Sequence, residues 1–296
     1  MGTEKRKILI LGGGSFIGRH LHTRVGSQRA DVTYRKATGL NDIIFDATKN
    51  SLSEKIDLRA DYSHGIILFS ETNVEHIAAN PEMARLLNVD HTKRVIDQLI
   101  ENDIVPVFAS SDGVYGGAKG RYSESDSVNP IIEYGHQKRD VEQYLLATGC
   151  DWLTLRFAKI YGKEFGDGTL VTAMLSALLD GTLTKAANDY FFSPIFIDEV
   201  TKLIVQFCEN GETGLYNVGG PDRVCHFDIA KYLENKLSPS KRPLLPVQGC
   251  SINEFIRHEN RAGDVSMNST KANKVLGSVV SSVFRVSDEL ILKGKQ

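Results

Sequence analysis

The sequence has few of the residues that stabilise secreted domains or bind metals. Four cysteines occur among 296 residues, and Cys150, Cys208, Cys225 and Cys250 form no closely spaced pair. This spacing predicts neither a zinc site nor a disulfide framework, and reduced thiols in a cytoplasmic protein fit it best. The eight histidines are scattered along the chain, so we expect no metal site.

Long hydrophobic runs and an excess of positive charge are also missing. The first apolar run, Ile8–Leu11, is too short for the core of a signal peptide, and no segment approaches the length of a membrane span. The formal net charge is −2, which does not indicate binding to nucleic acid or to an anionic membrane. We therefore expect a cytoplasmic protein with neither a nucleic-acid partner nor a membrane partner.

What the first half of the sequence does contain is an alternation of short β-rich runs with longer helical patterns. Helical stretches such as Pro81–Asn102 and Tyr134–Thr148 separate the strands. This alternation predicts an α/β fold with a doubly wound parallel sheet of the Rossmann type, which binds ligands at the carboxyl ends of its strands. The predicted strands are Lys7–Leu11, Asp31–Tyr34, Ile43–Phe45, Gly65–Phe69, Val105–Ala109 and Trp152–Arg156.

After about residue 160 the pattern is less regular. We expect residues 1–160 to form a dinucleotide-binding Rossmann domain. Residues 161–296 should form mainly a small C-terminal α/β lobe that binds substrate, with some segments returning to the first domain. The elements expected there are helices at Leu170–Asp180, Ile197–Glu209 and Phe227–Lys236, and strands at Ser193–Phe196 and Gly214–Val218.

A glycine-rich turn follows the first strand and reads G-G-G-S-F-I-G. Its glycines lie between a strand and a helix, which is the context of a turn that binds dinucleotide phosphates at a helix N-terminus. Ser15 stands where a middle glycine is expected, and its hydroxyl either bonds a phosphate oxygen or caps the helix. The expected cofactor-binding residues of the turn are Gly12, Gly14, Ser15, Phe16 and Ile17.

The end of the second strand bears on the choice between NADP and NAD. A carboxylate there would bond the ribose 2′-hydroxyl of NAD, but Arg35 and Lys36 follow this strand. A guanidinium can clamp a 2′-phosphate, so Arg35 favours NADP, with NAD as the alternative. Asp46, at the end of the third strand, is the expected adenine contact, with Ala47 beside it.

A Ser, Tyr and Lys set follows the fifth strand. The stretch F-A-S-S-D-G-V-Y-G-G, Phe108–Gly117, places hydroxyls at the carboxyl end of the sheet. Tyr134 and Lys138 are four residues apart, so they share one face of a helix. A tyrosine with an ordinary pKa near 10 is a poor proton carrier at neutral pH, and the Lys138 ammonium can lower that pKa by favouring the phenolate.

These segments resemble the extended short-chain dehydrogenase/reductase family, and within it the dTDP-4-dehydrorhamnose reductase group. The strongest likeness is S-S-D-G-V-Y-G-G-A-K-G-R-Y-S-E-S-D-S-V-N-P-I-I-E-Y-G-H-Q-K, Ser110–Lys138. N-P-E-M-A-R-L-L-N-V-D is also similar, with Asn88 at the position of the family's helix asparagine. So are L-R-F-A-K-I-Y-G, F-S-P-I-F-I-D-E-V and Y-N-V-G-G-P.

The resemblance implies NADPH-dependent hydride transfer to a keto carbon of a nucleotide-linked 4-keto-6-deoxy sugar. Ser111 would polarise the substrate oxygen, Tyr134 would donate the proton, and Lys138 would hold the nicotinamide ribose. The further residues expected beside the cofactor are Phe69, Ser70, Ser110 and Phe157. The residues expected to contact substrate are Glu71, Asp112, Lys159 and Arg261.

Two other functions stay open on the same fold. S-F-I-G resembles the turn of the epimerases, and Gly113 replaces a tyrosine that is common in the reductase group. The first alternative is a sugar-nucleotide epimerase that retains NAD(P), and the second is a non-catalytic regulatory subunit that binds a nucleotide. The resemblance also adds a homodimer, formed through the helices that flank the sheet, as an open option.

Overall fold

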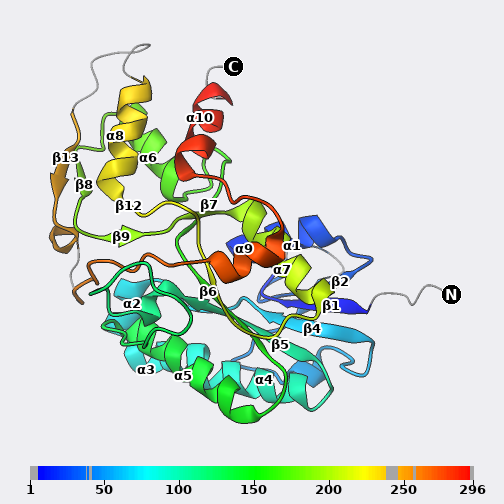
Figure 1. Ribbon diagram of the computed structural model, residues 1–296. Coiled ribbons are helices and arrows are strands. Elements are labelled where there is room, and N and C mark those ends of the chain that lie inside the picture. Colours follow the sequence, from blue (N-terminus) through cyan, green and yellow to red (C-terminus); the bar gives the residue numbers. More distant parts are fainter. Residues whose placement is uncertain (1–5, 38, 40–41, 238–245, 256–257, 294–296) are drawn as a thin grey trace. The chain divides into compact units, whose positions relative to one another are not determined.

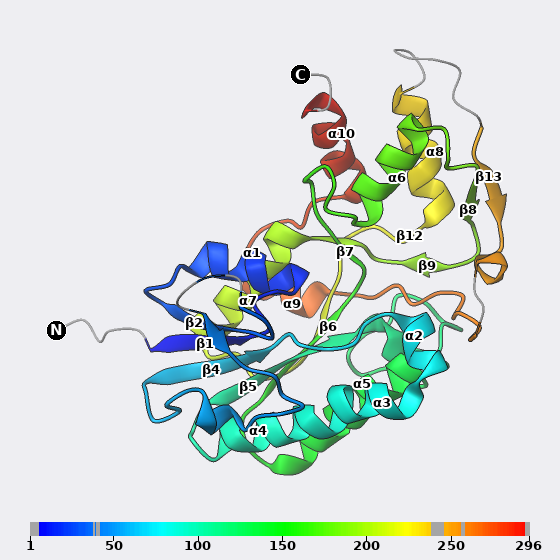
Figure 2. The same cartoon turned by 180° about the vertical axis from the view of Figure 1, so that it is seen from behind.

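The computed structural model describes residues 6–37, 39, 42–237, 246–255 and 258–293 (Figure 1, Figure 2). The chain divides into two compact units. Unit 1 comprises Met1–Ser111, Glu133–Arg156 and Thr201–Tyr216, and unit 2 comprises Asp112–Ile132, Phe157–Val200 and Asn217–Gln296. The expected domain boundary at residue 160 stays a prediction.

A seven-stranded sheet runs through unit 1 in the order β11-β6-β5-β4-β1-β2-β3. The pairs β1–β2, β1–β4, β2–β3 and β4–β5 are all parallel. The strand order reverses between β1 and β4, which is where doubly wound sheets bind their ligands. The predicted fold class is therefore confirmed. The strands are β1 (Lys7–Leu11), β2 (Ala30–Tyr34), β3 (Ile43–Ile44), β4 (Tyr62–Ile67), β5 (Val105–Ser111), β6 (Leu153–Phe157) and β11 (Gly214–Val218).

Helices cover both faces of this sheet (Figure 1, Figure 2). One face carries α3 (Pro81–Arg85), α4 (Thr92–Ile100) and α5 (Glu133–Thr148), and the other carries α1 (Phe16–Val25) and α7 (Ile197–Asn210). Burial on both faces accounts for the unbroken apolar run of β1, in which residues 9–11 are fully buried. The remaining short elements are α2 (Val74–Ala79) and the 3₁₀ turns Leu52–Glu54, Asp112–Val114 and Ile252–Glu254.

The helix expected over Pro81–Asn102 is not continuous. A π-helical segment, Leu86–His91, separates α3 from α4. π-Helical turns are rare and occur frequently at functional sites. This segment places the Asn88 side chain in the interior, where only 2% of the residue is exposed.

Unit 2 is an α/β assembly of short strand pairs and helices. β10 pairs with β7 and β13 with β8 in parallel, whereas β12 pairs with β9 antiparallel. No helix in the described part of the chain is long and apolar enough to cross a membrane. The strands are β7 (Ile160–Tyr161), β8 (Lys185–Ala187), β9 (Phe191–Phe192), β10 (Ile195–Phe196), β12 (Val224–Cys225) and β13 (Gln248–Cys250). The helices are α6 (Leu170–Leu179), α8 (His226–Leu237), α9 (Thr270–Leu276) and α10 (Val283–Lys293).

Candidate active site

The glycine turn is closed on its protein side and open on the other. Gly12 has a φ of +106°, and a Cβ there would lie 2.8 Å from the backbone nitrogen of Phe69. A Cβ on Gly18 would lie 2.3 Å from the Gly12 carbonyl oxygen, so both positions require glycine. Gly14 is exposed, and a Cβ there would meet no atom within 4 Å. This open side lets a ligand approach the backbone closely.

Ser15 caps the helix that the turn opens. Its Oγ accepts a hydrogen bond from the Gly18 N–H at 3.0 Å and donates one to the Gly12 carbonyl at 2.8 Å. Of the two roles predicted for this hydroxyl, capping is thus the one observed. The first turn of α1 includes Phe16 and Ile17, whose N–H groups have no acceptor within the helix and form an anion-binding terminus. The turn therefore fits the pyrophosphate of a dinucleotide.

Arg35 and Asp46 lie near each other beyond the ends of β2 and β3. The Asp46 carboxylate accepts hydrogen bonds from the Thr48 N–H at 3.0 Å and the Thr48 hydroxyl at 2.7 Å. The Thr48 hydroxyl is the main cause that lowers the pKa of Asp46, and the charge of Arg35 contributes to the same shift. Arg35 is exposed, so its guanidinium is accessible to a ligand. The adenine contact expected of Asp46 stays a prediction.

Two aromatic rings pack together close to the glycine turn. Phe69 packs edge to face on Phe45, with 6.3 Å between the ring centroids. Phe45 and Ala47 are buried in the core cluster of unit 1. Phe69, which follows β4, is half-buried and comes close to Gly12 through its backbone. The place beside a cofactor that is expected for Phe69 and Ala47 stays a prediction.

Asn88 fixes the loop that follows β4. Its Oδ1 accepts hydrogen bonds from the Ser70 hydroxyl at 2.9 Å and the Glu71 N–H at 2.8 Å. Its Nδ2 donates to the Glu71 carbonyl at 3.0 Å and to Gln137 Oε1 at 2.8 Å. A buried amide with every hydrogen-bonding position in use holds its partners in one geometry. The π-helical segment thus positions Ser70 and Glu71 and joins them to α5.

The Glu71 side chain is engaged in its own loop. Its carboxylate accepts from the Asn73 N–H at 2.8 Å and pairs with His76 Nδ1 at 3.0 Å. Burial acts to raise the pKa of Glu71, but these hydrogen bonds outweigh it and hold the pKa below its ordinary value. The substrate contact expected of Glu71 stays a prediction.

The three residues expected to be catalytic all belong to unit 1. Ser111 is the last residue of β5, and Tyr134 and Lys138 lie in the first half of α5. Lys138 Nζ donates to the Ala109 carbonyl of β5 at 2.8 Å and lies 5.4 Å from the centroid of the Tyr134 ring. The lysine therefore ties the tyrosine-bearing turn of α5 to the end of the strand that carries Ser111.

A buried ion pair beneath Lys138 was missed from the sequence. Glu142 accepts a hydrogen bond from Arg156 Nη2 at 2.6 Å, and Arg156 is 4% exposed. The Ser110 hydroxyl also donates a hydrogen bond to the Glu142 carboxylate, so it helps to hold Glu142 in the ion pair with Arg156. Burial lowers the pKa of Lys138 to about 7, and the charge of Glu142 opposes that shift. Glu142 continues the four-residue spacing of Tyr134 and Lys138, and that repeat was the signal available in the sequence.

Three of the four expected substrate contacts, Asp112, Lys159 and Arg261, belong to unit 2. Burial raises the pKa of Tyr190, with Asp112 adding to the shift and Arg261 opposing it. Burial lowers the pKa of His226 to about 4, and the charge of Lys159 adds to that shift. Asp112, Lys159 and Arg261 are therefore each close enough to one of these rings to act on it. Phe157, the last residue of β6, is buried.

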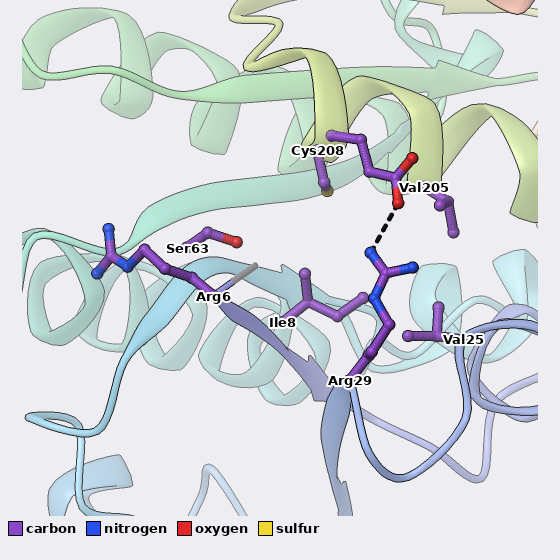
Figure 3. A pocket seen from close by; sticks show the side chains of 8 residues that line it. Arg6, Ile8, Val25, Arg29, Ser63, Val205 and Cys208 are labelled. Carbon is purple, nitrogen blue, oxygen red and sulfur yellow. Dashed lines mark hydrogen bonds and ion pairs between the residues drawn. The ribbon is translucent and has the colours of Figure 1, made fainter. Parts of the chain in front are cut away.

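A separate hollow of about 210 Å³ opens at the opposite end of the strands (Figure 3). Arg29 Nη2 donates a hydrogen bond to Glu209 Oε1 at 2.6 Å across it, and burial raises the pKa of the Cys208 thiol to about 12. Ligands of doubly wound sheets bind at the carboxyl ends of the strands, so this hollow is not the candidate active site. Its lining residues are Arg6, Ile8, Val25, Arg29, Ser63, Val205, Cys208 and Glu209.

Curated proteins of several names are similar to this chain. A dTDP-4-dehydrorhamnose reductase from Aggregatibacter actinomycetemcomitans is 25% identical, with 76% of each chain covered. An uncharacterised UDP-glucose epimerase from Bacillus subtilis is also 25% identical, with 77% of this chain and 81% of the relative covered. Methionine adenosyltransferase 2 subunit beta from Pongo abelii is 22% identical, with 88% of this chain and 81% of the relative covered.

A solved structure and a protein family are also similar to this chain. The dTDP-4-dehydrorhamnose reductase from Bacillus anthracis, solved in complex with NADP, has a TM-score of 0.81 at 18% identity, covering 98% of this chain and 100% of that one. At that identity the likeness shows the fold. The family described as the RmlD substrate binding domain matches residues 6–290. The chain therefore belongs to this family, in agreement with the likeness to the extended short-chain dehydrogenase/reductases.

Proposed function

We propose that this protein is an NADPH-dependent enzyme that reduces a keto group on a nucleotide-linked 4-keto-6-deoxy sugar. The observation that carries the proposal is the position of Lys138, which is buried beside the Tyr134 ring and bonded to the strand that ends in Ser111. Such a lysine next to a tyrosine is the arrangement needed to use a phenol as an acid near neutral pH.

Different residues of unit 1 would bind the cofactor and transfer the proton. The glycine turn and the start of α1 would hold the pyrophosphate of NADPH, and Arg35 would clamp its 2′-phosphate. When bound, NADPH supplies the hydride. Ser111 would donate a hydrogen bond to the keto oxygen, and Tyr134 would pass its hydroxyl proton to that oxygen. Lys138 in its charged form would stabilise the phenolate that remains, and the Glu142 carboxylate favours that charged form.

The proposal has support from the relatives and from unit 2. Named reductases of dTDP-4-dehydrorhamnose lie among the similar proteins, and one of them was solved with NADP. Lys159, Arg261 and Asp112 would supply charged groups for a nucleotide-linked sugar, and Glu71 would supply a carboxylate. We propose the cytoplasm as the site of action, because all four cysteines are free thiols. The homodimer stays a prediction.

An epimerase that retains NAD(P) is the second candidate. The B. subtilis relative named as an epimerase is as similar as the reductase from A. actinomycetemcomitans. An epimerase returns its hydride to the same sugar, so it would consume no NADPH and would purify with cofactor bound. A non-catalytic regulatory subunit is the third candidate, since one relative is named as the beta subunit of another enzyme. Such a subunit would bind nucleotide without turnover.

The test is to mix the protein with NADPH and a panel of 4-keto sugar nucleotides and to follow the absorbance of NADPH. We expect loss of NADPH with at least one sugar. Tyr134→Phe should lower kcat by about 10²- to 10⁴-fold, because general acid catalysis contributes that much. Tyr144→Phe is the matched control, since this tyrosine lies on the same helix and bonds Asp97. Absence of NADPH loss with every sugar would refute the reductase proposal.

A further inference from the structure

A buried glutamine lies in the second turn of α5, directly before Lys138. Gln137 is 0% exposed, and its Oε1 accepts a hydrogen bond from Asn88 Nδ2 at 2.8 Å. Its Nε2 donates to Glu133 Oε1 at 3.1 Å and to the Pro81 carbonyl at 3.4 Å. The side chains of Asn88 and Gln137 therefore form one continuous path of hydrogen bonds, the amide path, which ends at the start of α5.

The hydrogen bonds of the amide path have one possible direction. Asn88 Oδ1 accepts from the Glu71 N–H at 2.8 Å, and a backbone N–H can only donate. The nitrogen of Asn88 must therefore face Gln137, whose oxygen accepts from it. The Gln137 nitrogen then donates to the Glu133 carboxylate and to the Pro81 carbonyl, which can only accept. Because neither amide can turn around without losing these bonds, the path holds its two ends in one geometry.

The other end of the amide path is the loop that follows β4. Asn88 bonds both Ser70 and Glu71 of this loop. The preceding residue, Phe69, lies next to the glycine turn, since a Cβ on Gly12 would come within 2.8 Å of its backbone nitrogen. Ligands of doubly wound sheets bind where the strand order reverses, which here is between β1 and β4. The amide path therefore joins the ligand-binding edge of the sheet to α5.

We propose that Gln137 is a positioning residue, which acts through Asn88 to set where the loop after β4 lies relative to the Tyr134 turn of α5. The inference deepens the proposed function, and its rate measurement rests on that function. Hydride and proton must reach the same keto group, so the cofactor and the proton donor have to be aligned with each other. The competing explanation is that Gln137 only stabilises the start of α5. Its loss would then lower stability and leave the rate per folded molecule unchanged.

The first measurement needs no reaction. Gln137→Met keeps the length of the side chain and removes its amide. Hydrogen exchange of the Glu71 N–H, followed by NMR relative to the amides of β5, should become about 2- to 10-fold faster, the range for one neutral hydrogen bond. Gln98→Met is the matched control, because this half-buried glutamine of α4 holds another loop of unit 1 by accepting from the Leu52 N–H at 2.8 Å. It should leave the relative exchange at Glu71 unchanged.

The second measurement is the rate with NADPH and a sugar that the wild type reduces. Gln137→Met should lower kcat by about 10- to 100-fold with little change in KM, because misplaced groups still bind but are poorly aligned. Gln98→Met should keep the kcat of wild type. The double variant Glu133→Gln/Gln137→Glu exchanges donor and acceptor within the pair and keeps an acceptor for Asn88. Its kcat should recover to within about threefold of wild type.

Melting temperature, measured for every variant, shows that each is folded at the temperature of the assays. Unchanged exchange at Glu71 in Gln137→Met would overturn the proposal, and so would a kcat equal to that of wild type. A double variant as slow as Gln137→Met would overturn it as well. If the wild type reduces none of the sugars, the reductase is refuted, and the exchange measurement by itself decides whether Gln137 positions the loop.

Discussion

Lys138 in unit 1 and His226 in unit 2 are both bases whose pKa is lowered by burial, and they differ in what lies next to them. For Lys138 the result is a pKa of about 7, with the Glu142 carboxylate acting against the shift. For His226 it is about 4, with the Lys159 ammonium acting in the same direction as burial. Lys138 Nζ has the Ala109 carbonyl as partner, whereas His226 Nδ1 has none among the described residues.

Burial lowers the pKa of both groups, but the neighbouring charge makes the outcome different. Desolvation disfavours the charged form of any base, and the sign of the nearest charge then decides where the group titrates. An anion keeps Lys138 close to the pH at which a catalytic group exchanges protons. Burial, with the Lys159 cation acting in the same direction, keeps His226 neutral. The variants below change these neighbours, starting with the largest expected effect.

Glu142→Gln should have the largest effect on the comparison. It removes the anion beside Lys138 and leaves the Arg156 guanidinium buried without its ionic partner. We expect the free energy of unfolding to fall by about 3–5 kcal/mol, because breaking a buried pair strands a charge. The pKa of Lys138 should fall further below about 7. Urea denaturation at pH 7 measures the first effect.

An exposed ion pair of the same residue types provides the control. Arg29 and Glu209 also lie 2.6 Å apart, but their side chains are 46% and 30% exposed, against 5% and 10% for Arg156 and Glu142. Glu209→Gln should therefore cost at most about 1 kcal/mol. Similar losses for the two variants would contradict the importance of burial for the Glu142 pair.

Lys138→Met should change the dependence of stability on pH. The pKa of Lys138 is about 7 in the folded protein and 10.5 as the ordinary value. Between these values the unfolded chain binds a proton that the folded chain has lost, so stability rises with pH across this window. The wild type should gain up to about 1.4 kcal/mol per pH unit relative to Lys138→Met.

Urea denaturation of both proteins at pH 7, 8 and 9 tests the sign. The difference between the two proteins isolates Lys138, because other groups titrate in both of them. A difference that does not grow with pH would mean that Lys138 stays fully charged in the folded protein. The contrast with His226 would then rest on partners alone.

The sequence predicts best those features that repeat locally. Alternating β and helical runs predict the sheet, and the spacing of Tyr134 and Lys138 predicts their common helix face. The helix cap at Ser15 was one of two alternatives, since a serine before a helix accepts from the first turn wherever it occurs. Each of these inferences depends on neighbours within a few residues.

Features made by tertiary contacts were missed. Arg156 meets Glu142 only because β6 returns beside α5, and Tyr190 meets His226 across 36 positions of the chain. The π-helical segment is hidden for a different reason. The apolar stripe from Leu86 to Ile100 has the period of an α-helix, so it does not indicate a π-helical segment. That segment accompanies the four hydrogen bonds of Asn88, whose partners lie far away in the sequence.

Lys159→Ala should have the smallest effect and gives the sharpest test of the comparison. Removing the ammonium should raise the pKa of His226 from about 4, but not as far as its ordinary value of 6.5, because burial is the larger cause. An NMR titration that follows the His226 ring, compared with the wild type, measures this shift. An unchanged pKa would mean that Lys159 does not act on the ring, and a return to 6.5 would mean that burial does not. The first result would remove the charge contrast with Lys138, and the second would remove the shared role of burial.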